Sequence, residues 1–265
     1  VLLLTVSEVS FFLSLVDFFK RELEGDPGLK LFGGLHIGLS AFFLILYIIL
    51  IVNRKRLKEF GHFTIIRRIM AALLFANMVV HYTGRIAIGE WRLEEDLPFH
   101  LCFITNFFMM YILSADNKHN LYRIIYFFTL IGPLPAIIWP DLHRTWGGYI
   151  FYQFIISHHI MLLFSLYCLF VLEYETSVKG VVMTFFIGNA YIGLMAVFNH
   201  FFNTNYVMIG ELPAQLYVVY PFLDKMPAIF WLELVGILVL IVAYVPTHFL
   251  GKHHIENDIK KEKTT

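Results

Sequence analysis

The amino-acid sequence predicts an all-α, polytopic membrane protein with seven transmembrane helices. Hydrophobic residues make up 58% of the chain and charged residues 15%, whereas a soluble domain carries roughly 25% charge. Seven apolar stretches each approach the length of about 20 residues that crosses the hydrocarbon core of a bilayer. Polar residues recur at one depth when these stretches are threaded in alternating directions. The formal net charge of +0 argues against nucleic acid as a partner.

The chain is expected to divide into three parts. Residues 1–30 form the N-terminal part, in which the segment 1–19 is apolar but interrupted by Glu8 and Asp17. This pattern is typical of an interfacial amphipathic helix, with an eighth span as the alternative. Residues 31–250 form the transmembrane domain, and residues 251–265 form a basic cytoplasmic tail. The spans are predicted near residues 31–52, 67–88, 97–114, 121–139, 149–172, 179–202 and 226–250.

The basic residues set the expected orientation. The loop after the first span carries Arg54, Lys55, Arg56 and Lys58, and the C-terminal tail is also rich in lysine. The loop after the second span is acidic instead, around residues 90–96. Cytoplasmic loops of membrane proteins carry an excess of Lys and Arg. We therefore expect a multi-pass protein of the cell membrane with its N-terminus outside and its C-terminus in the cytoplasm.

Two segments are expected to depart from simple helices. Pro133 and Pro135 interrupt the fourth span, which predicts either a packing kink or the wall of a cavity. The connection 203–223 is long and apolar, and we expect it to fold over the outer end of the bundle as a lid. Cys102 and Cys168 fall in opposite halves of the bilayer, so no disulfide between them is expected.

The polar residues within the spans are the main functional signal. A polar or ionisable side chain in hydrocarbon costs several kcal/mol, so it indicates function by default. Interhelical hydrogen bonding is the plain alternative for each residue alone. Gathered in one half of the bilayer, they predict a single site that opens outward, comprising His36, Asn77, His81, Arg85, His100, Cys102, Asn106, His158, Asn199 and Glu233.

Helical spacing groups some of these side chains. Asn77, His81 and Arg85 are spaced i, i+4 and i+8, so they form one stripe on the second span. Cys102 and Asn106 share a face of the third span by the same rule. His100 is two residues from Cys102 and is expected to point away from it. Each stripe must face protein or water, because lipid would leave its polar groups unsatisfied.

Several chemistries fit this set of residues. Cys102 as nucleophile with His158 as base is one, because the thiolate is the reactive form of cysteine. Zinc also takes His, Cys and carboxylate ligands, but no HExxH or CxxC pattern is present, and we expect no metal and no cofactor. A retinal-type Schiff base would need a lysine in mid-membrane, and Lys225 lies only at the edge of the last span.

Four motifs occur in a fixed order along the second half of the chain. They are LPFHLC at 97–102, IGPLPAIIWPDL at 131–142, YQFIISHH at 152–159 and NTNY at 203–206. In these motifs the chain resembles the YwaF-like bacterial integral membrane proteins, whose animal relative is transmembrane protein 164. The similarity spans roughly residues 97–232, about half of the chain.

This resemblance implies a seven-helix membrane fold and an activity. The animal relative is regarded as a cysteine-dependent phospholipid acyltransferase. By the resemblance, Cys102 corresponds to its nucleophile and His158 to the histidine partner, while Asn205 and Tyr206 correspond to the Asn-Tyr element of the family.

The sequence therefore favours a membrane-embedded acyltransferase that acts on a membrane phospholipid through an acyl thioester on Cys102. Asn106 or His81 would donate hydrogen bonds to the oxyanion, and the lipid headgroup would lie beside Arg85. A transporter or solute-binding membrane protein with a polar pocket is the alternative. A third reading is a subunit whose pocket binds another membrane protein. The enzyme requires Cys102 and His158 to meet in one hydrophilic chamber.

Overall fold

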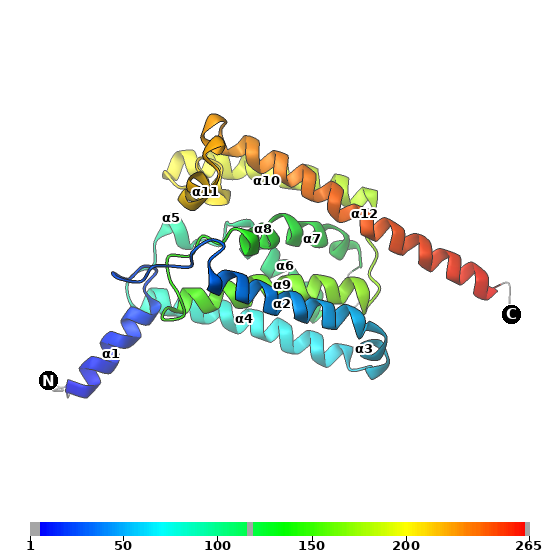
Figure 1. Cartoon of the computed structure of the whole chain (residues 1–265), viewed down its shortest axis with the longest axis horizontal. Helices are drawn as coiled ribbons and strands as arrows, with labels where there is room; N and C mark the ends of the chain where they lie inside the picture. Colours follow the sequence, from blue (N-terminus) through cyan, green and yellow to red (C-terminus); the bar gives the residue numbers. More distant parts are fainter. Residues whose placement is uncertain (1–5, 116–118, 263–265) are drawn as a thin grey trace.

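The computed structural model describes residues 6–115 and 119–262, and within these ranges every regular element is helical (Figure 1). In chain order the elements are α1 (Val6–Phe19), α2 (Gly34–Val52), α3 (Arg54–Phe60), α4 (Phe63–Ala87), α5 (Leu93–Asp96), α6 (Leu101–Ser114), α7 (His119–Ile131), α8 (Pro133–Ile138), α9 (Tyr149–Phe170), α10 (Val178–Phe202), the 3₁₀ helix η1 (Tyr206–Met208), α11 (Ala214–Val219), the 3₁₀ helix η2 (Pro221–Lys225) and α12 (Ala228–Glu262).

Helix α9 forms the centre of the bundle. In its most apolar window 61% of the residues are buried, against 11% for α2 and for α10. Helices α2, α4, α6, α7 and α8 all pack against it. On the other side α7 contacts α10 and α12, which lie together across one face of the molecule (Figure 1). Because α9 is enclosed on several sides, its polar side chains must find partners inside the protein or remain unsatisfied.

The main hydrophobic core lies among α4, α6, α7 and α9. Leu74, Met109, Phe127 and Phe164 are all 0% exposed there. The fully buried Tyr122 belongs to the same cluster and donates its hydroxyl proton to the carbonyl oxygen of Ser165, at 2.7 Å. This core fixes how α6 lies against α4 and α9, the helices that carry the candidate site.

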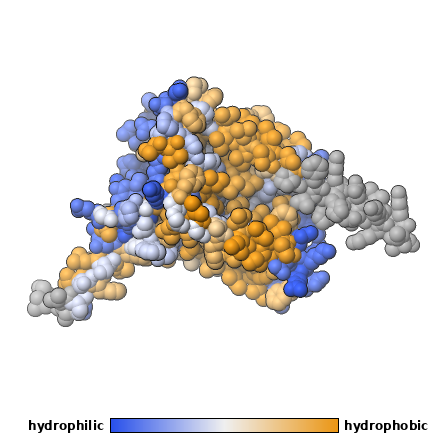
Figure 2. Space-filling model, viewed as in Figure 1, coloured by the Kyte–Doolittle hydropathy of each residue, from blue (hydrophilic) through white to orange (hydrophobic). Residues whose placement is uncertain are grey.

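The protein is a multi-pass membrane protein. Within residues 6–115 and 119–262, six helical segments are long and apolar enough to cross a bilayer: Gly34–Val52, Thr64–Ala87, Asn120–Ile138, Tyr149–Phe170, Val178–Phe202 and Ala228–Val245. Figure 2 shows hydrophilic residues gathered at two opposite ends of the molecule, with apolar surface between them. That distribution is expected where a band of side chains faces hydrocarbon.

The third predicted span, 97–114, is not confirmed. It corresponds to α6, whose 14 residues rise about 21 Å, less than the roughly 30 Å of a hydrocarbon core. Leu97 and His100 are both extended. A residue that precedes proline, as Leu97 precedes Pro98, is disfavoured in the helical conformation. Helix α6 begins at Leu101, one residue before Cys102. The orientation of the termini stays a prediction.

The expected interruption of the fourth span is present. Helix α7 ends at Ile131 and α8 begins at Pro133, with Gly132 between them. Proline has no N–H to donate and its ring crowds the preceding turn, so a continuous helix is disfavoured there. A Cβ added at Gly132 would lie 3.3 Å from the side chain of Leu101. The break therefore packs closely against the first turn of α6.

The two ends of the chain are held differently. Helix α1 exposes the apolar side chains of Phe11, Phe12 and Leu13, as an interfacial helix does. The buried Arg144 donates to the carbonyl oxygens of Asp17 and Lys20, at 2.8 and 3.0 Å, and so caps the end of α1. At the other end α12 continues to Glu262. The connection 203–223 contains η1, α11 and part of η2, which makes it largely ordered secondary structure.

Candidate active site

Cys102 lies in the first turn of α6. His100 is the N-cap of this helix, and no side chain accepts a hydrogen bond from its first-turn amides at that position. The amides and the positive end of the helix dipole favour an anionic group beside them, whereas burial of the sulfur disfavours the thiolate and is the larger effect. The thiol is free and half-buried, and Tyr82 and Tyr191 are near enough to interact with it electrostatically.

His158 lies on α9 with its ring buried and stacked on Phe154, with 4.1 Å between ring centroids. Its Nδ1 lies 2.8 Å from the carbonyl oxygen of Phe154. A carbonyl oxygen only accepts, so Nδ1 must carry the proton of this hydrogen bond. In the neutral ring Nε2 then keeps its lone pair, and no hydrogen bond to Nε2 occurs within the described residues. His158 is thus oriented by its own helix and retains a free basic nitrogen.

The helices that carry Cys102 and His158 contact each other. Across the described ranges, no hydrogen bond joins the sulfur of Cys102 to the imidazole of His158. The sequence hypothesis requires these groups to exchange a proton. Within the described residues no contact between the two side chains is found, so their proton exchange stays a prediction.

A cluster of buried polar atoms without partners lies on α4 and α6 around Cys102. Among the described residues, Nδ1 of His81, Oη of Tyr82, Oγ1 of Thr105 and Oδ1 of Asn106 are all buried and have no hydrogen-bond partner. The rings of His81 and Tyr82 both pack near Phe103, at 5.9 and 6.1 Å between ring centroids. Buried unsatisfied polar groups are rare in native proteins, and each calls for an explanation. We call these four residues the unpartnered cluster.

Asn77, from the same predicted stripe as His81, is fully used in helix packing. Its Nδ2 donates to the carbonyl oxygen of Gln153 at 3.1 Å and to Oγ of Ser157 at 2.8 Å. Its Oδ1 accepts from the hydroxyl of Tyr149 at 2.8 Å. These contacts bind α4 to α9, as asparagine often does between membrane helices.

Arg85, the predicted headgroup ligand, belongs to a buried ion-pair network at the acidic end of the bundle. Its guanidinium lies 3.1 Å from Asp96 and 3.3 Å from Glu90. Asp96 also pairs with Arg21 at 2.8 Å and accepts from the backbone N–H of Arg92. Burial alone would raise the pKa of Asp96, but that N–H and the two guanidinium groups outweigh it and lower the pKa.

The Asn-Tyr element holds the loop that follows α10. Asn199 accepts from the N–H of Tyr206 and donates to its carbonyl oxygen, both at 2.9 Å. Asn205 donates to the carbonyl oxygen of Glu211 at 2.8 Å. The hydroxyl of Tyr206 accepts from the N–H of Leu97 at 2.9 Å. Tyr206 therefore positions the loop against the segment that leads into α6, while Asn199 and Asn205 hold the loop itself in shape.

His100 contacts the same loop, since its ring lies 5.1 Å from that of Tyr206. Glu233 is half-buried in α12, and no hydrogen bond or ion pair to it is found in the part of the chain that the structure describes. His36 accepts from the N–H of Phe32 and donates to the carbonyl oxygen of Ile137, so both of its ring nitrogens are used. The presence of a histidine in an apolar segment is therefore not enough to assign it to the site.

A comparison with protein families shows the family to which the chain belongs. The model of the TMEM164 family matches residues 31–245, which cover α2 to α10 and most of the apolar part of α12. The chain belongs to the TMEM164 family. Cys102, His158 and the whole unpartnered cluster lie inside the region that this TMEM164 family model matches, whereas α1 lies outside it. The narrower YwaF-like resemblance stays a prediction.

An uncharacterized protein of Treponema pallidum (strain Nichols) is also similar to this TMEM164 family chain. It is 25% identical over 241 residues, which cover 88% of this chain and 96% of the relative. No solved structure matches the chain. The two proteins therefore align over almost their full lengths, and the relative adds no activity to the comparison.

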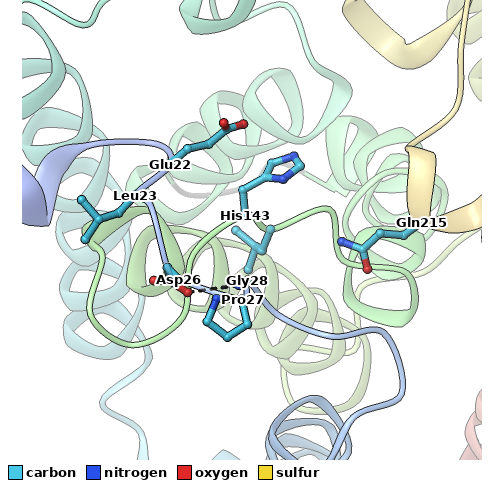
Figure 3. A pocket seen from close by; sticks show the side chains of 8 residues that line it. Glu22, Leu23, Asp26, Pro27, Gly28, His143 and Gln215 are labelled. Carbon is cyan, nitrogen blue, oxygen red and sulfur yellow. Dashed lines mark hydrogen bonds between the residues drawn. The ribbon is translucent and has the colours of Figure 1, made fainter.

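A cavity of about 190 Å³ lies at the acidic end of this TMEM164 family protein (Figure 3). Glu22, Asp26, His143 and Gln215 contribute to its wall. The carboxylate of Asp26 already accepts hydrogen bonds from the side chains of Thr145 and Arg144. Neither Cys102 nor His158 lines this cavity, and among the described residues no group of three or more His, Cys, Asp or Glu side chains is arranged to hold a metal.

Two members of the unpartnered cluster, Tyr82 and Thr105, were not predicted from the sequence. Tyr82 follows His81 directly and Thr105 precedes Asn106 directly, but stripes counted at i and i+4 pass over such neighbours. Both side chains are common near membrane interfaces or within helices for structural reasons. Only the absence of a partner for each hydroxyl, which depends on packing, marks them out.

Proposed function

We propose that this member of the TMEM164 family is a membrane-embedded acyltransferase that acts on phospholipid through an acyl thioester on Cys102. The observation that carries the proposal is the position of Cys102 at the N-terminus of α6, beside the unpartnered cluster. Family membership agrees with a membrane acyltransferase-like role. The cell membrane as its location, and a membrane lipid as its substrate, belong to the same proposal.

In the first half-reaction the sulfur of Cys102 attacks the ester carbonyl carbon of a phospholipid. The thiol proton passes to Nε2 of His158, directly or through a water. The tetrahedral intermediate then collapses, the carbon–oxygen ester bond breaks, and His158 returns the proton to the leaving oxygen. The products are a lysophospholipid and an acyl group joined to Cys102 as a thioester.

In the second half-reaction an acceptor hydroxyl attacks the thioester. His158 takes the proton of that hydroxyl, the carbon–sulfur bond breaks, and the proton returns to the sulfur of Cys102. The acceptor leaves as an ester, and the enzyme regains its starting state. No oxidant, metal or cofactor is consumed in either half-reaction.

The unpartnered cluster supports the oxyanion role predicted for Asn106 and His81. Within the described residues no hydrogen bond is made by Nδ2 of Asn106 or by a ring nitrogen of His81, so an N–H of each side chain remains available to a substrate oxygen. The unpartnered Oδ1 of Asn106 can only accept. Donors fixed in a low-dielectric site stabilise developing charge more strongly than they do in water. Tyr82 and Thr105 extend the same set of donors.

The experiment uses the two free cysteines as a matched pair. Purified protein is incubated with phospholipid of a single acyl composition, and the adduct is measured by intact-mass spectrometry. We expect wild type and Cys168→Ala to gain one acyl mass that hydroxylamine removes, and Cys102→Ala to gain none. Cys168 is the appropriate control because it is also a free cysteine but is buried in the hydrophobic core.

Acyl transfer by Cys102→Ala at the wild-type rate would show that the thioester step is wrong. Retention of a bound solute, with no adduct in any variant, would favour the transporter or solute-binding alternative. Folding of each variant is checked by its thermal unfolding midpoint in the same detergent.

A further inference from the structure

A surface groove of about 440 Å³ runs between α4 and α6 at the end of the bundle that carries α3. Its lining contains the side chains of Arg68, Ala71, Ala72, Phe75, Met110, Tyr111 and Ser114. The groove lies away from the first turn of α6, because Met110 and Ser114 are in the last two turns of that helix. It is therefore a different place from the site around Cys102.

The groove is polar at one end and apolar along its length. Arg68 lies in the second turn of α4 and Ser114 is the last residue of α6, so both mark the end near α3. From Arg68 the small side chains of Ala71 and Ala72 lead to Phe75, over about 10 Å of helix rise. A single lipid molecule has the same division, with a polar headgroup at one end and an acyl chain behind it.

The polar end carries a cation that has no partner in the described ranges. Arg68 is exposed, and no hydrogen bond or ion pair to it is present there. The neighbouring helix α3 adds the exposed cations Arg54, Lys55 and Arg56. Lys58 adds little, because its ammonium group pairs with Glu173 at 2.5 Å. The end of the bundle that carries α3 therefore has an excess of positive charge, even with the exposed Glu59 of that helix counted.

The apolar walls of the groove and its place in a membrane bundle indicate that the anion is the headgroup of a lipid. The apolar walls of the groove are exposed, with Phe75 62% and Tyr111 49% accessible. Surface of that kind between two helices of a membrane bundle is covered by acyl chains. A guanidinium at the interface binds phosphate oxygens in paired hydrogen bonds. A cation near an anionic leaflet contributes about 1 kcal/mol of attraction.

We propose that the α4–α6 groove binds one anionic phospholipid, with its phosphate at Arg68 and an acyl chain along Ala71, Ala72 and Phe75. This lipid is separate from the substrate of the proposed reaction. Its site lies at the opposite end of α4 from His81, where the basic surface of the protein meets the membrane.

The test is a competition between two lipids that differ only in headgroup. Purified full-length protein in detergent is mixed with equal amounts of phosphatidylglycerol and phosphatidylcholine that have the same acyl chains, and native mass spectrometry counts each bound lipid. We expect wild type to retain phosphatidylglycerol preferentially. Arg68→Gln should reduce that preference by about fivefold, the effect of about 1 kcal/mol.

Two further variants separate the groove from the general charge of this end. Lys55→Gln removes the same charge from the neighbouring helix, outside the groove, and should leave the preference unchanged. Ala72→Trp fills the groove without changing any charge and should reduce the number of retained lipids. Thermal unfolding midpoints confirm that each variant is folded.

An unchanged headgroup preference in Arg68→Gln would overturn the proposal. An equal loss of headgroup preference in Lys55→Gln would also overturn it. The attraction would then come from the general positive charge of this end of the protein and would not require a binding site in the groove. Displacement of the bound lipid by inorganic phosphate alone would show an anion site that does not need the acyl chain. None of these measurements requires acyl transfer, so the proposal and the proposed enzymatic function fail independently.

Discussion

The guanidinium of Arg85 lies 3.1 Å from the carboxylate of Asp96, and the two side chains are 3% and 0% exposed. The second oxygen of Asp96 pairs with Arg21, which follows α1 in the chain. One buried carboxylate thus links the N-terminal segment, the end of α4 and the short helix α5. This link orders the segment that leads to Cys102.

Replacement of Asp96 by asparagine should destabilise the protein strongly. Removal of one partner of a buried ion pair leaves a charge uncompensated, which costs about 3–5 kcal/mol. The thermal unfolding midpoint in detergent measures the loss. Glu94→Gln is the control, because Glu94 is exposed and lies two residues away. Equal midpoints for Asp96→Asn and Glu94→Gln would mean that the network does not contribute to stability.

The same carboxylate predicts a loss of stability in acid. The pKa of Asp96 in the folded protein lies below its ordinary value of 3.8. Its contribution is therefore complete above the pKa of the unfolded chain and is lost as the pH falls through the folded pKa. Unfolding midpoints measured from about pH 6 downward should fall below about pH 4.

In Asp96→Asn this decline should be shallower. It should not vanish, because hydrogen bonds from Thr145, Gly28 and Arg144 outweigh burial and lower the pKa of Asp26 as well. Parallel pH curves for wild type and Asp96→Asn would contradict the assignment to Asp96.

Replacement of Arg144 by alanine should release α1 from the bundle. Arg144 is 1% exposed, donates to the last carbonyl groups of α1 and pairs with Asp26 at 3.0 Å. Its removal leaves those carbonyl groups and one carboxylate without a partner. Limited proteolysis should then cut between residues 20 and 30, where wild type resists. His143→Ala should resist like wild type, because His143 is the exposed neighbour of Arg144.

Asn106→Leu should separate stability from activity. Oδ1 of Asn106 is buried without a partner, and replacement of such a group by an apolar side chain of similar shape is neutral or stabilising. If Asn106 stabilises the oxyanion, the rate of adduct formation should nevertheless fall by about 10²–10³. Unfolding midpoints and the time course of the acyl adduct test both parts. A less stable variant with an unchanged rate would reverse the interpretation.

His158→Ala and His159→Ala should behave oppositely. His158 keeps a free Nε2 beside its bond to Phe154, so its removal should slow adduct formation by about 10²–10⁴. Nδ1 of His159 is bonded to the hydroxyl of Tyr47 at 2.7 Å, so its removal should lower the unfolding midpoint and spare the rate of the folded protein. The reverse pattern would assign the base to His159.

Much of the fold could be predicted from composition and hydrophobic length. The six long apolar helices and the break before Pro133 follow from local properties of the chain. The predicted span 97–114 is not confirmed, because residues 97–100 are not helical. Hydropathy places Leu97 in the span, whereas Pro98 disfavours the helical conformation at Leu97.

The site could be predicted only as a collection of residue types. In the sequence Asn77 and Asn106 are alike, since each is an asparagine in an apolar segment. Asn77 lies one turn before His81, and Asn106 lies one turn after Cys102. In the structure Asn77 binds Gln153, Ser157 and Tyr149 across two helices, and Asn106 binds nothing among the described residues. His36 and His158 differ in the same way. One has both ring nitrogens occupied and the other has one free.

The sequence by itself determined that this chain is helical, that it resides in a membrane and that polar side chains lie within its apolar segments. Those properties depend on residues close together in the chain. The tertiary structure decided which of these polar groups are satisfied, because their partners come from helices distant in sequence that α9 brings together. Whether a polar atom remains available to bind a substrate depends on that packing. The sequence pattern of a single helix does not reveal this.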